Sequence, residues 1–404
     1  MIRIVGLTRP LLATLLGMTV ALAGPVAAAQ PPIGHVFMIV LENKGFEDTF
    51  GAHTQAPYFA HELTRQGVLL TQYFGTAHYS LGNYLAMISG QGGTPQTRDD
   101  CETFEDFVSS GTTADGQEIG HGCVYPAHTK TLADQLQTVG RSWQGYMEDI
   151  GNNPQRENAR CGAPTIGAPD PTQSAQKGDQ YAARHNPFVY FHSLVDSGAC
   201  ADHVGPLAQL SKDLETVATT PAFAFITPNL CNDGHDAPCK DGAPGGLVSA
   251  DAFLKTWVPR ILESPAFRKD GLLIVTFDEG DSVQTTLPDG RIQDVFEGQS
   301  CCGQQPGPNI GPFPAIESDD HYVTKLQSFG GDRTGTVLVS PFLRAGAVST
   351  TPFNHYSLLK SIEDLLGTRG HLGYAAQPGL IGFFDAGSDI QTATHAVLPA
   401  KDHR

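Results

Sequence analysis

One serine lies where the chain could carry a nucleophile. Ser80 follows an apolar, strand-like run from Val68 to Phe74 and opens a helix-like run from Leu81 to Ile88. At such a junction the hydroxyl lies beside the unpaired N–H groups of the first helical turn, and the helix dipole favours an anion there. Ser80 is therefore a candidate nucleophile that accepts a phosphoryl group, although a serine that merely caps a helix would occupy the same position.

Acidic and amide side chains follow two runs that are typical of buried strands. His35–Leu41 and Leu272–Phe277 are continuously apolar, a pattern that predicts strands covered on both faces of a parallel sheet. The carboxyl ends of such strands share one edge of the sheet, which is where ligands bind. The side chains expected at this edge are Glu42, Asn43, Asp278 and Glu279.

Strand and helix patterns alternate along the chain. Further strands are expected over Trp143–Met147, Ala222–Ile226 and Thr336–Pro341. Helices are expected over roughly Tyr58–Gln66, Thr131–Val139, Pro206–Val217, Ser249–Leu262 and His355–Leu366. This alternation predicts an α/β fold of three layers, with a mostly parallel sheet and helices on both faces.

Residues 1–29 are typical of a cleaved export signal. Arg3 and Arg9 precede an apolar stretch from Leu11 to Gly24, and small residues follow up to Ala29. Cleavage would remove those two positive charges and take the formal net charge from −17 to about −19. Such an acidic chain is a poor partner for nucleic acid, and a phosphate site would need a local cation. We expect a secreted or periplasmic protein without a transmembrane anchor in the mature chain.

Residues 30–404 contain no linker, charge run or repeat, so we expect a single domain. The stretch from about 281 to 332 is rich in Gly, Pro, Asp and Gln, which predicts a long insertion, either ordered or mobile. Eight cysteines in an exported chain favour disulfides, and their spacing fits no zinc module. Adjacent Cys301 and Cys302 are expected to take different partners, because a bond between neighbours is strained.

Six short blocks, which extend over most of the mature chain, carry a family resemblance. In chain order they are Ile39-Val40-Leu41-Glu42-Asn43, His78-Tyr79-Ser80-Leu81-Gly82-Asn83-Tyr84, Arg184-His185-Asn186-Pro187, Thr227-Pro228-Asn229 through Asn232-Asp233-Gly234-His235-Asp236, Phe277-Asp278-Glu279-Gly280 and Asn354-His355-Tyr356. With them the chain resembles the bacterial phosphoesterase family of the alkaline-phosphatase superfamily, most closely its secreted acid phosphatases of the phosphatidylinositol-3-phosphatase type. The resemblance implies an alkaline-phosphatase-like fold and a metal-dependent phosphatase for phosphorylated small molecules or lipid head groups.

The same resemblance implies roles for the polar side chains. Ser80 would attack phosphorus and form phosphoserine while completing the shell of a divalent metal, whose other ligands would be Glu42, Asn43, Asp278 and Glu279. Oxygen ligands of this kind suit Ca²⁺ or Mg²⁺. The leaving oxygen would be protonated, or the phosphoryl group contacted, by His235 and His355. Substrate-binding candidates are Asn83, His78, Arg184 and His185, of which His78 could equally be a packing residue and His185 a loop anchor.

Two other functions stay open at this stage. A phospholipase C-type phosphodiesterase would use the same blocks, although phospholipases of this family generally carry extra C-terminal domains. A secreted metal-binding protein that has lost catalysis is the alternative from another class, and the presence of Ser80 with all four oxygen ligands argues against it. An α/β-hydrolase esterase is disfavoured because the chain lacks a Gly-x-Ser-x-Gly elbow.

Overall fold

The computed structural model describes residues 1–2, 6, 30–318 and 320–393, so most of the predicted export signal lies outside the described residues. An eight-stranded sheet forms the centre, in the order β17-β2-β16-β11-β1-β10-β7-β9. Neighbouring strands run parallel, except where β16 pairs with β11 and β2. The strands are β1 (His35–Leu41), β2 (Val68–Leu70), β7 (Trp143–Met147), β9 (Val204–Pro206), β10 (Phe223–Thr227), β11 (Gly271–Phe277), β16 (Thr336–Val339) and β17 (Ala347–Ser349).

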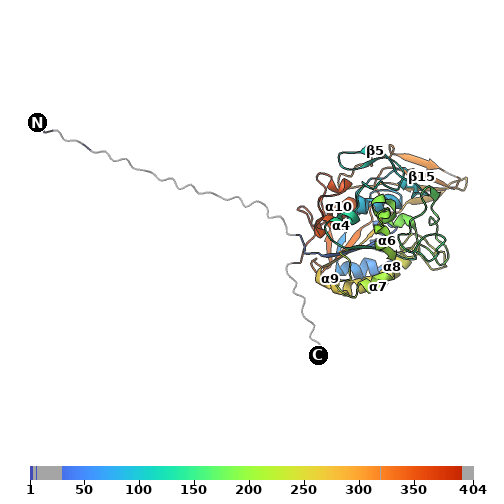
Figure 1. The fold of residues 1–404 in the computed structure, drawn as a ribbon, viewed down its shortest axis with the longest axis horizontal. Coiled ribbons are helices and arrows are strands. Elements are labelled where there is room, and N and C mark those ends of the chain that lie inside the picture. The colour runs from blue at the N-terminus through green and yellow to red at the C-terminus, as the bar shows by residue number, and fades with distance from the viewer. Residues whose placement is uncertain (3–5, 7–29, 319, 394–404) are drawn as a thin grey trace, which may run out of the picture.

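Strand β1 shows how the sheet separates two cores. Its side chains alternate between the faces, so Val36 and Met38 belong to one buried cluster, while Phe37 and Ile39 belong to the other. Helices cover both faces, with α4 and α10 on one side and α7, α8 and α9 on the other (Figure 1). The predicted three-layer α/β fold is confirmed. The main helical elements are η1 (Tyr58–Leu63), α3 (Ser80–Ser89), α4 (Leu132–Thr138), α7 (Gln209–Asp213), α8 (Gly246–Glu263), α9 (Pro265–Asp270) and α10 (His355–Leu366).

Local differences from the expected helices have simple causes. The helix expected over Pro206–Val217 is shorter in the structure and corresponds to α7. Its expected first residue, Pro206, belongs to β9, which pairs with β7. Helix α8 begins three residues before Ser249, whose hydroxyl accepts a hydrogen bond from the N–H of Gly245 at 3.0 Å. By contrast, Asn354 caps α10 as predicted, since its Oδ1 accepts the N–H of Ser357 at 3.0 Å.

The predicted insertion is ordered and forms its own sheet. Its strands pair in the order β12-β13-β15-β14 and lie at the periphery, where Figure 1 labels β15. Hydrogen bonds join the insertion to the segment before Ser80; for example, the hydroxyl of Tyr79 donates to Thr324 Oγ1 at 3.2 Å, and Gln304 Nε2 donates to the carbonyl of Thr76 at 2.7 Å. The strands are β12 (Val283–Thr286), β13 (Ile292–Phe296), β14 (Ala315–Ser318) and β15 (Tyr322–Leu326).

The disulfides correct one prediction. Cys301 and Cys302 are bonded to each other, not to separate partners. The other six cysteines pair in chain order, as Cys101–Cys123, Cys161–Cys200 and Cys231–Cys239. Because these six cysteines are bonded to one another, Cys301 and Cys302 have only each other as disulfide partners.

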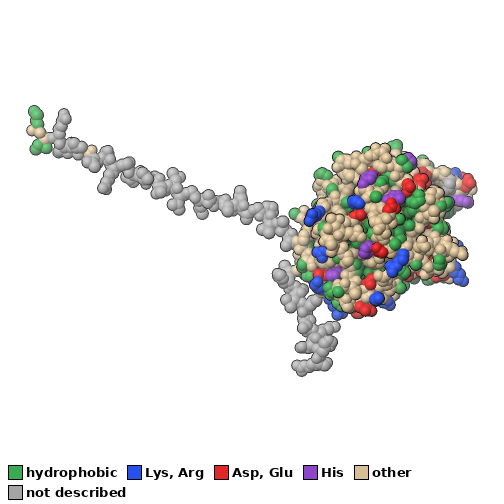
Figure 2. Space-filling model, viewed as in Figure 1, with side chains coloured by type: hydrophobic (Ala, Val, Ile, Leu, Met, Phe, Trp, Pro, Cys, Tyr) green, Lys and Arg blue, Asp and Glu red, His purple; other side chains and the backbone are tan. Residues whose placement is uncertain are grey.

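The surface shows no strong segregation of charge in the view of Figure 2, where Lys, Arg, Asp and Glu side chains are interspersed on one face. Within the described part of the chain, no helix has the length and apolar character that crossing a membrane requires.

Candidate active site

Two neighbouring parallel strands bring their terminal carboxylates together. Leu41 of β1 and Phe277 of β11 are paired in register, so Glu42 and Asp278 leave the sheet side by side. Both side chains are completely buried. Asn43 follows the same turn, and its backbone N–H donates to Asp278 Oδ1 at 3.0 Å. The edge of the sheet therefore gathers these three predicted metal ligands.

Ser80 contacts this edge from the start of α3. The residue before it, Tyr79, is the N-cap, so the Ser80 hydroxyl is not a capping group. Instead Ser80 Oγ donates to Glu42 Oε2 at 2.8 Å. One turn later, Tyr84 donates its hydroxyl to the other oxygen of Glu42. Sequence reasoning missed Tyr84, although a spacing of four from Ser80 places it on the same helical face.

A third carboxylate and a histidine complete the cluster. His185 Nε2 lies 3.3 Å from Glu42 Oε2, and its Nδ1 lies 3.3 Å from Asp233 Oδ2. The imidazole stacks on the ring of Tyr84, with centroids 5.2 Å apart. Asp233 follows β10 on a turn, and its carbonyl accepts the N–H of Glu42 at 2.8 Å. Asp233 was missed as a site residue, and its presence in one of the six blocks was the available signal.

The electrostatics of the cluster favour a bound cation. Burial, and then repulsion from Asp278 and Asp233, holds the pKa of Glu42 well above its ordinary value. Burial likewise raises the pKa of Asp233 and of Asp278. Burial, helped by the positive charge of Arg184, lowers the pKa of His185 well below its ordinary value, so the imidazole is neutral and can act as a ligand.

The donor atoms present fit a divalent metal. Four buried atoms of the cluster have no hydrogen-bond partner among the described residues, namely Asn43 Oδ1, Asp233 Oδ2, Asp278 Oδ2 and His185 Nε2. Glu42, His185 and Asp233 also offer ligand atoms within 4.8 Å of one another. Unpaired oxygens of this kind are expensive to bury unless a cation pairs with them.

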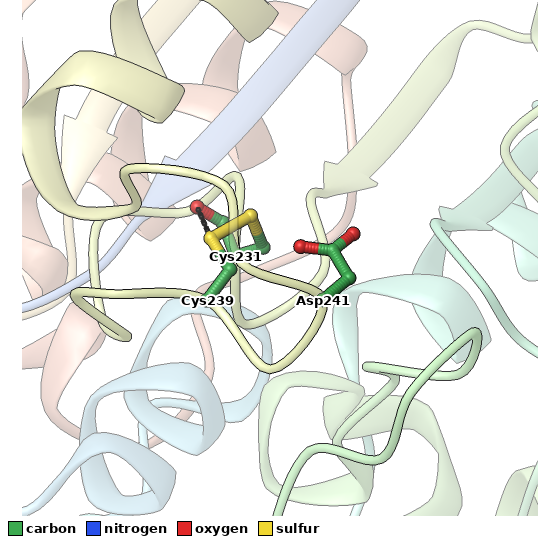
Figure 3. A group of neighbouring side chains, drawn as sticks. All are labelled: Cys231, Cys239 and Asp241. Atoms are coloured by element: carbon green, nitrogen blue, oxygen red, sulfur yellow. Dashed lines mark hydrogen bonds between the residues drawn. A yellow bond between two sulfur atoms is a disulfide. The ribbon is translucent and has the colours of Figure 1, made fainter.

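A second group of potential ligands can be excluded. Cys231, Cys239 and Asp241 lie within ligand distance of one another, but Figure 3 shows that the two sulfur atoms are bonded as a disulfide. Oxidised sulfur offers no thiolate to a metal.

Glu279, a predicted metal ligand, is engaged elsewhere. Its carboxylate pairs with Nδ1 of His78, and Nε2 of His78 lies 2.9 Å from Asp332 Oδ2. Burial alone would lower the pKa of His78, but the two carboxylates raise it to about 9. Asp332 also accepts the backbone N–H groups of Gly298 and Gln299. The three side chains, which we call the His78 clamp, fasten the insertion to the loop before Ser80.

Two other predicted site residues have their polar atoms occupied by the protein. Asn83 Oδ1 accepts the N–H groups of Thr76 and Ala77 at 2.7 and 2.9 Å, and its Nδ2 donates to the carbonyl of Ala77. His355 Nε2 donates to the carbonyl of Asp278, and Nδ1 is 2.9 Å from the hydroxyl of Tyr73. Burial lowers the pKa of His355 to about 4. Both residues therefore hold the site's backbone in place.

His235 is the more accessible histidine of the region. Its ring lies 6.3 Å from that of His185, and its side chain is 33% exposed. Nδ1 is 2.8 Å from Asp236 Oδ1, while Nε2 has no hydrogen bond to the described residues. Arg184 is buried beside the cluster, where its Nε lies 3.6 Å from Asp100 Oδ2. Asp100 in turn accepts the N–H of Leu81 at the start of α3.

These elements define a class of protein: an α/β fold with a hydroxyl and a cluster of buried carboxylates at the carboxyl edge of its parallel sheet. Residues 53–368 match the family model of the Phosphoesterase family. The chain belongs to this family, as the six blocks predicted.

Individual relatives are more distant. A phosphate-repressible acid phosphatase of Penicillium chrysogenum is 28% identical over 55% of this chain and 43% of its own length. A phosphatidylinositol-3-phosphatase of Mycobacterium tuberculosis is 26% identical over 83% of this chain and 89% of its own length. The chain spans about half the length of the fungal relatives it matches. Among solved structures, a protein in the alkaline phosphatase superfamily from Vibrio parahaemolyticus matches with a TM-score of 0.44 and 11% identity, over 85% of this chain and 68% of that one.

Proposed function

We propose that this protein is a metal-dependent phosphatase that hydrolyses phosphomonoesters through a phosphoserine intermediate on Ser80. The observation that carries the proposal is the hydrogen bond from Ser80 Oγ to Glu42, made inside a cluster of three buried carboxylates. A serine that only capped a helix would bond to the backbone of its own helix, and Ser80 does not. Membership of the Phosphoesterase family supports the same chemistry.

The chain's own groups suit the first step. Glu42 Oε2 already accepts the Ser80 hydroxyl, so it can take that proton as the Oγ–P bond forms and the bond to the leaving oxygen breaks. A divalent cation held by Glu42, Asn43, Asp278 and Asp233 would supply positive charge that stabilises the phosphoryl oxygens and the ionised serine. Glu279 would join this set only by leaving His78.

We assign protonation of the leaving oxygen to His235. Its Nε2 has no hydrogen bond to the described residues and belongs to a partly exposed ring that Asp236 orients, whereas the unpaired Nε2 of His185 is buried in the Glu42 cluster. The sequence made His355 a candidate for this role as well, but both of its ring nitrogens are hydrogen-bonded. Arg184 and His185 remain candidates for contacts with substrate or phosphate.

The substrates we propose are phosphorylated small molecules or lipid head groups, supported by the similarity to a phosphatidylinositol-3-phosphatase. Export to the periplasm or the outside of the cell is also a proposal. It is supported by the four disulfides, because thiols stay reduced in the cytosol.

One assay separates the candidate functions. Release of the alcohol leaving group is measured from a monoester and from a diester, each with and without a chelator. We expect release from the monoester that stops when metal is removed. Release from the diester alone would favour a phospholipase C-type enzyme, and metal binding without any release would indicate a protein that has lost catalysis.

A further inference from the structure

A second pair of buried acids lies outside the Glu42 cluster, in the loop that leads from β7 to Arg184. Glu157 and Asp179 are only 4% and 2% exposed. Their carboxyls lie within hydrogen-bonding reach of each other. Glu157 Oε2 and Asp179 Oδ2 are both buried without a hydrogen-bond partner among the described residues. Two such oxygens repel each other unless a proton or a cation lies between them.

The remaining oxygens of the pair are fixed in place. Glu157 Oε1 accepts the N–H of Gly151 at 2.8 Å. Asp179 Oδ1 lies 3.0 Å from Arg156 Nη1 and accepts the N–H of Tyr181 at 3.3 Å. Neither carboxyl can therefore turn away without breaking another bond.

Arg156 ties the pair to a long stretch of backbone. Its guanidinium donates to the carbonyls of Pro171, Ser174, Asp179 and Tyr181. We call residues 171–181 the arginine-held loop. Because Asp179 is the counter-ion of Arg156, a disturbance of the acid pair reaches the whole loop.

The arginine-held loop supports the candidate active site from two sides. On one side, the backbone carbonyl of Gln173 accepts a hydrogen bond from Arg184 Nη1, and Thr172 Oγ1 accepts a hydrogen bond from the N–H of Ala183. On the other side, the carbonyl of Gln180 accepts the N–H of Leu230, at the start of the turn that carries Asp233. The loop thus contacts the backbone and side chains on which His185 and Asp233 depend.

We infer that Glu157 holds a proton that faces Asp179 and that the two side chains act as positioning residues, keeping the arginine-held loop closed under Arg184 and His185 only while that proton is bound. For its effect on phosphate chemistry this inference rests on the proposed function. Three other titratable groups interact electrostatically with this pair of acids, namely Asp149, the hydroxyl of Tyr181 and Arg156.

The direction of the pH effect follows from the environment of Glu157. Burial raises the pKa of Glu157 from 4.5 to about 7, and the charge of Asp179 adds to this shift. The hydrogen bond from the N–H of Gly151 and the charge of Arg156 oppose it. The folded loop therefore holds a proton that the unfolded chain releases. The stability of the closed loop is therefore greatest at acid pH and falls as the pH rises from about 4.5 to about 7. Over that range the equilibrium constant for opening the loop rises by at most about tenfold per pH unit.

Hydrogen exchange of the loop at pH 5 and pH 8 tests the inference without any turnover. After correction for the intrinsic exchange rate, we expect residues 171–181 of the wild type to open at least about tenfold more at pH 8. Glu157→Gln places a permanent donor against Asp179, so the loop should stay protected at both pH values. Glu215→Gln, a change at an exposed glutamate, should behave like the wild type.

Three outcomes would overturn the inference. The first is a pH dependence that persists in Glu157→Gln, and the second is a wild-type loop equally protected at both pH values. The third is protection at pH 8 that a chelator removes, because a cation would then occupy the place of the proton. Should Glu157→Gln not fold, the wild type measured with and without chelator still decides between the second and third outcomes and the inference.

Binding of inorganic phosphate tests the connection to the site. At pH 8 we expect Glu157→Gln to bind phosphate about tenfold more tightly than the wild type, and at pH 5 equally tightly. Equal binding at pH 8 would show that the loop does not position Arg184 and His185. If the loop opens as expected but no ester is hydrolysed, the proposed function fails and the inference about the loop stands.

Discussion

The Glu42 cluster and the His78 clamp contain similar residue types and meet at the end of β11, which supplies Asp278 to the one and Glu279 to the other, but their charges are balanced in opposite ways. In the clamp, one histidine lies between Glu279 and Asp332, and each of its ring nitrogens has a carboxylate partner. In the Glu42 cluster, two of the three carboxylates contact one histidine whose pKa is lowered, and four ligand atoms have no hydrogen-bond partner among the described residues.

This difference separates a structural site from a binding site. A buried ion group whose charges are balanced within the protein holds two segments together and has no need of a ligand. A buried group with excess negative charge and unpaired oxygens is destabilising on its own, and its cost is offset when a cation binds. The balance of partners, more than residue type, therefore distinguishes the Glu42 cluster as the candidate site for a cation.

The largest effect is expected at Ser80. Ser80→Ala should lower turnover by about 10⁴-fold or more, because it removes the proposed nucleophile. The unfolding free energy should fall by no more than about 3 kcal/mol, the value of one hydrogen bond to a charged group. Steady-state kinetics and chemical denaturation measure the two effects. Ser89→Ala is the matched control, since the hydroxyl of this α3 serine bonds only to backbone groups, the carbonyl of Leu85 and the N–H of Gln91. Turnover that survives in purified Ser80→Ala would remove Ser80 as the nucleophile.

Metal removal should distinguish the two clusters directly. Chelation is expected to abolish activity and to change how stability depends on pH. Without a cation, the raised pKa values of Glu42, Asp233 and Asp278 mean that the folded state holds protons the unfolded state releases. The chelated protein should therefore lose stability as the pH rises above about 4, while the metal-loaded protein should show a flatter profile. Thermal unfolding across pH checks this, and identical profiles would argue against a cation in the cluster.

The two histidines at the edge of the site should respond differently to the leaving group. His235→Ala should slow alkyl phosphates by about 10²- to 10⁴-fold and nitrophenyl phosphate much less, because a good leaving group needs little protonation. His355→Ala should slow both substrates equally, since His355 holds the carbonyl of Asp278 and has no free ring nitrogen. Comparing kcat for the two substrates in each variant decides it. The reverse pattern would return the acid role to His355.

Substitution in the His78 clamp should have the smallest effect on turnover, and its main effect should be on the free energy of unfolding. His78→Ala leaves two buried carboxylates unpaired and should cost about 3 to 5 kcal/mol of unfolding free energy. Since the pKa of His78 is raised to about 9, its contribution is complete below its ordinary value of 6.5 and is lost as the pH rises through about 9.

A matched control for the clamp lies at the surface. His192 also bridges two carboxylates, Asp106 and Asp196, but both of these are more than half exposed. His192→Ala should cost at most about 1 kcal/mol. Equal losses in the two variants would show that burial does not strengthen the clamp.

The framework of the site could be predicted because it depends on local patterns. Apolar runs that end in Glu42 and Asp278 predict adjacent buried strands, and parallel pairing then brings the two carboxylates together. Ser80 follows from the strand-to-helix junction, and the cap of α10 from Asn354. Each of these inferences needs only a strand end or a helix start.

The remaining residues depend on long-range packing that no local pattern encodes. Asp233 reaches Glu42 through a turn after β10, and His185 arrives on a short 3₁₀ turn from a loop. Glu279 follows Asp278 directly, but successive side chains leave a strand end in different directions. The carboxylate of Glu279 therefore pairs with His78. The bond between Cys301 and Cys302 likewise follows from how the other six cysteines pair.

Trapping the covalent intermediate tests the central claim most directly. The metal-loaded protein is mixed with a good phosphomonoester substrate, quenched in acid within one turnover, digested and analysed by mass spectrometry. The account predicts one phosphoryl group on the peptide that contains Ser80, absent from the Ser80→Ala variant and from chelated protein. Rapid turnover with no phosphopeptide, or with the phosphoryl group on another residue, would contradict it.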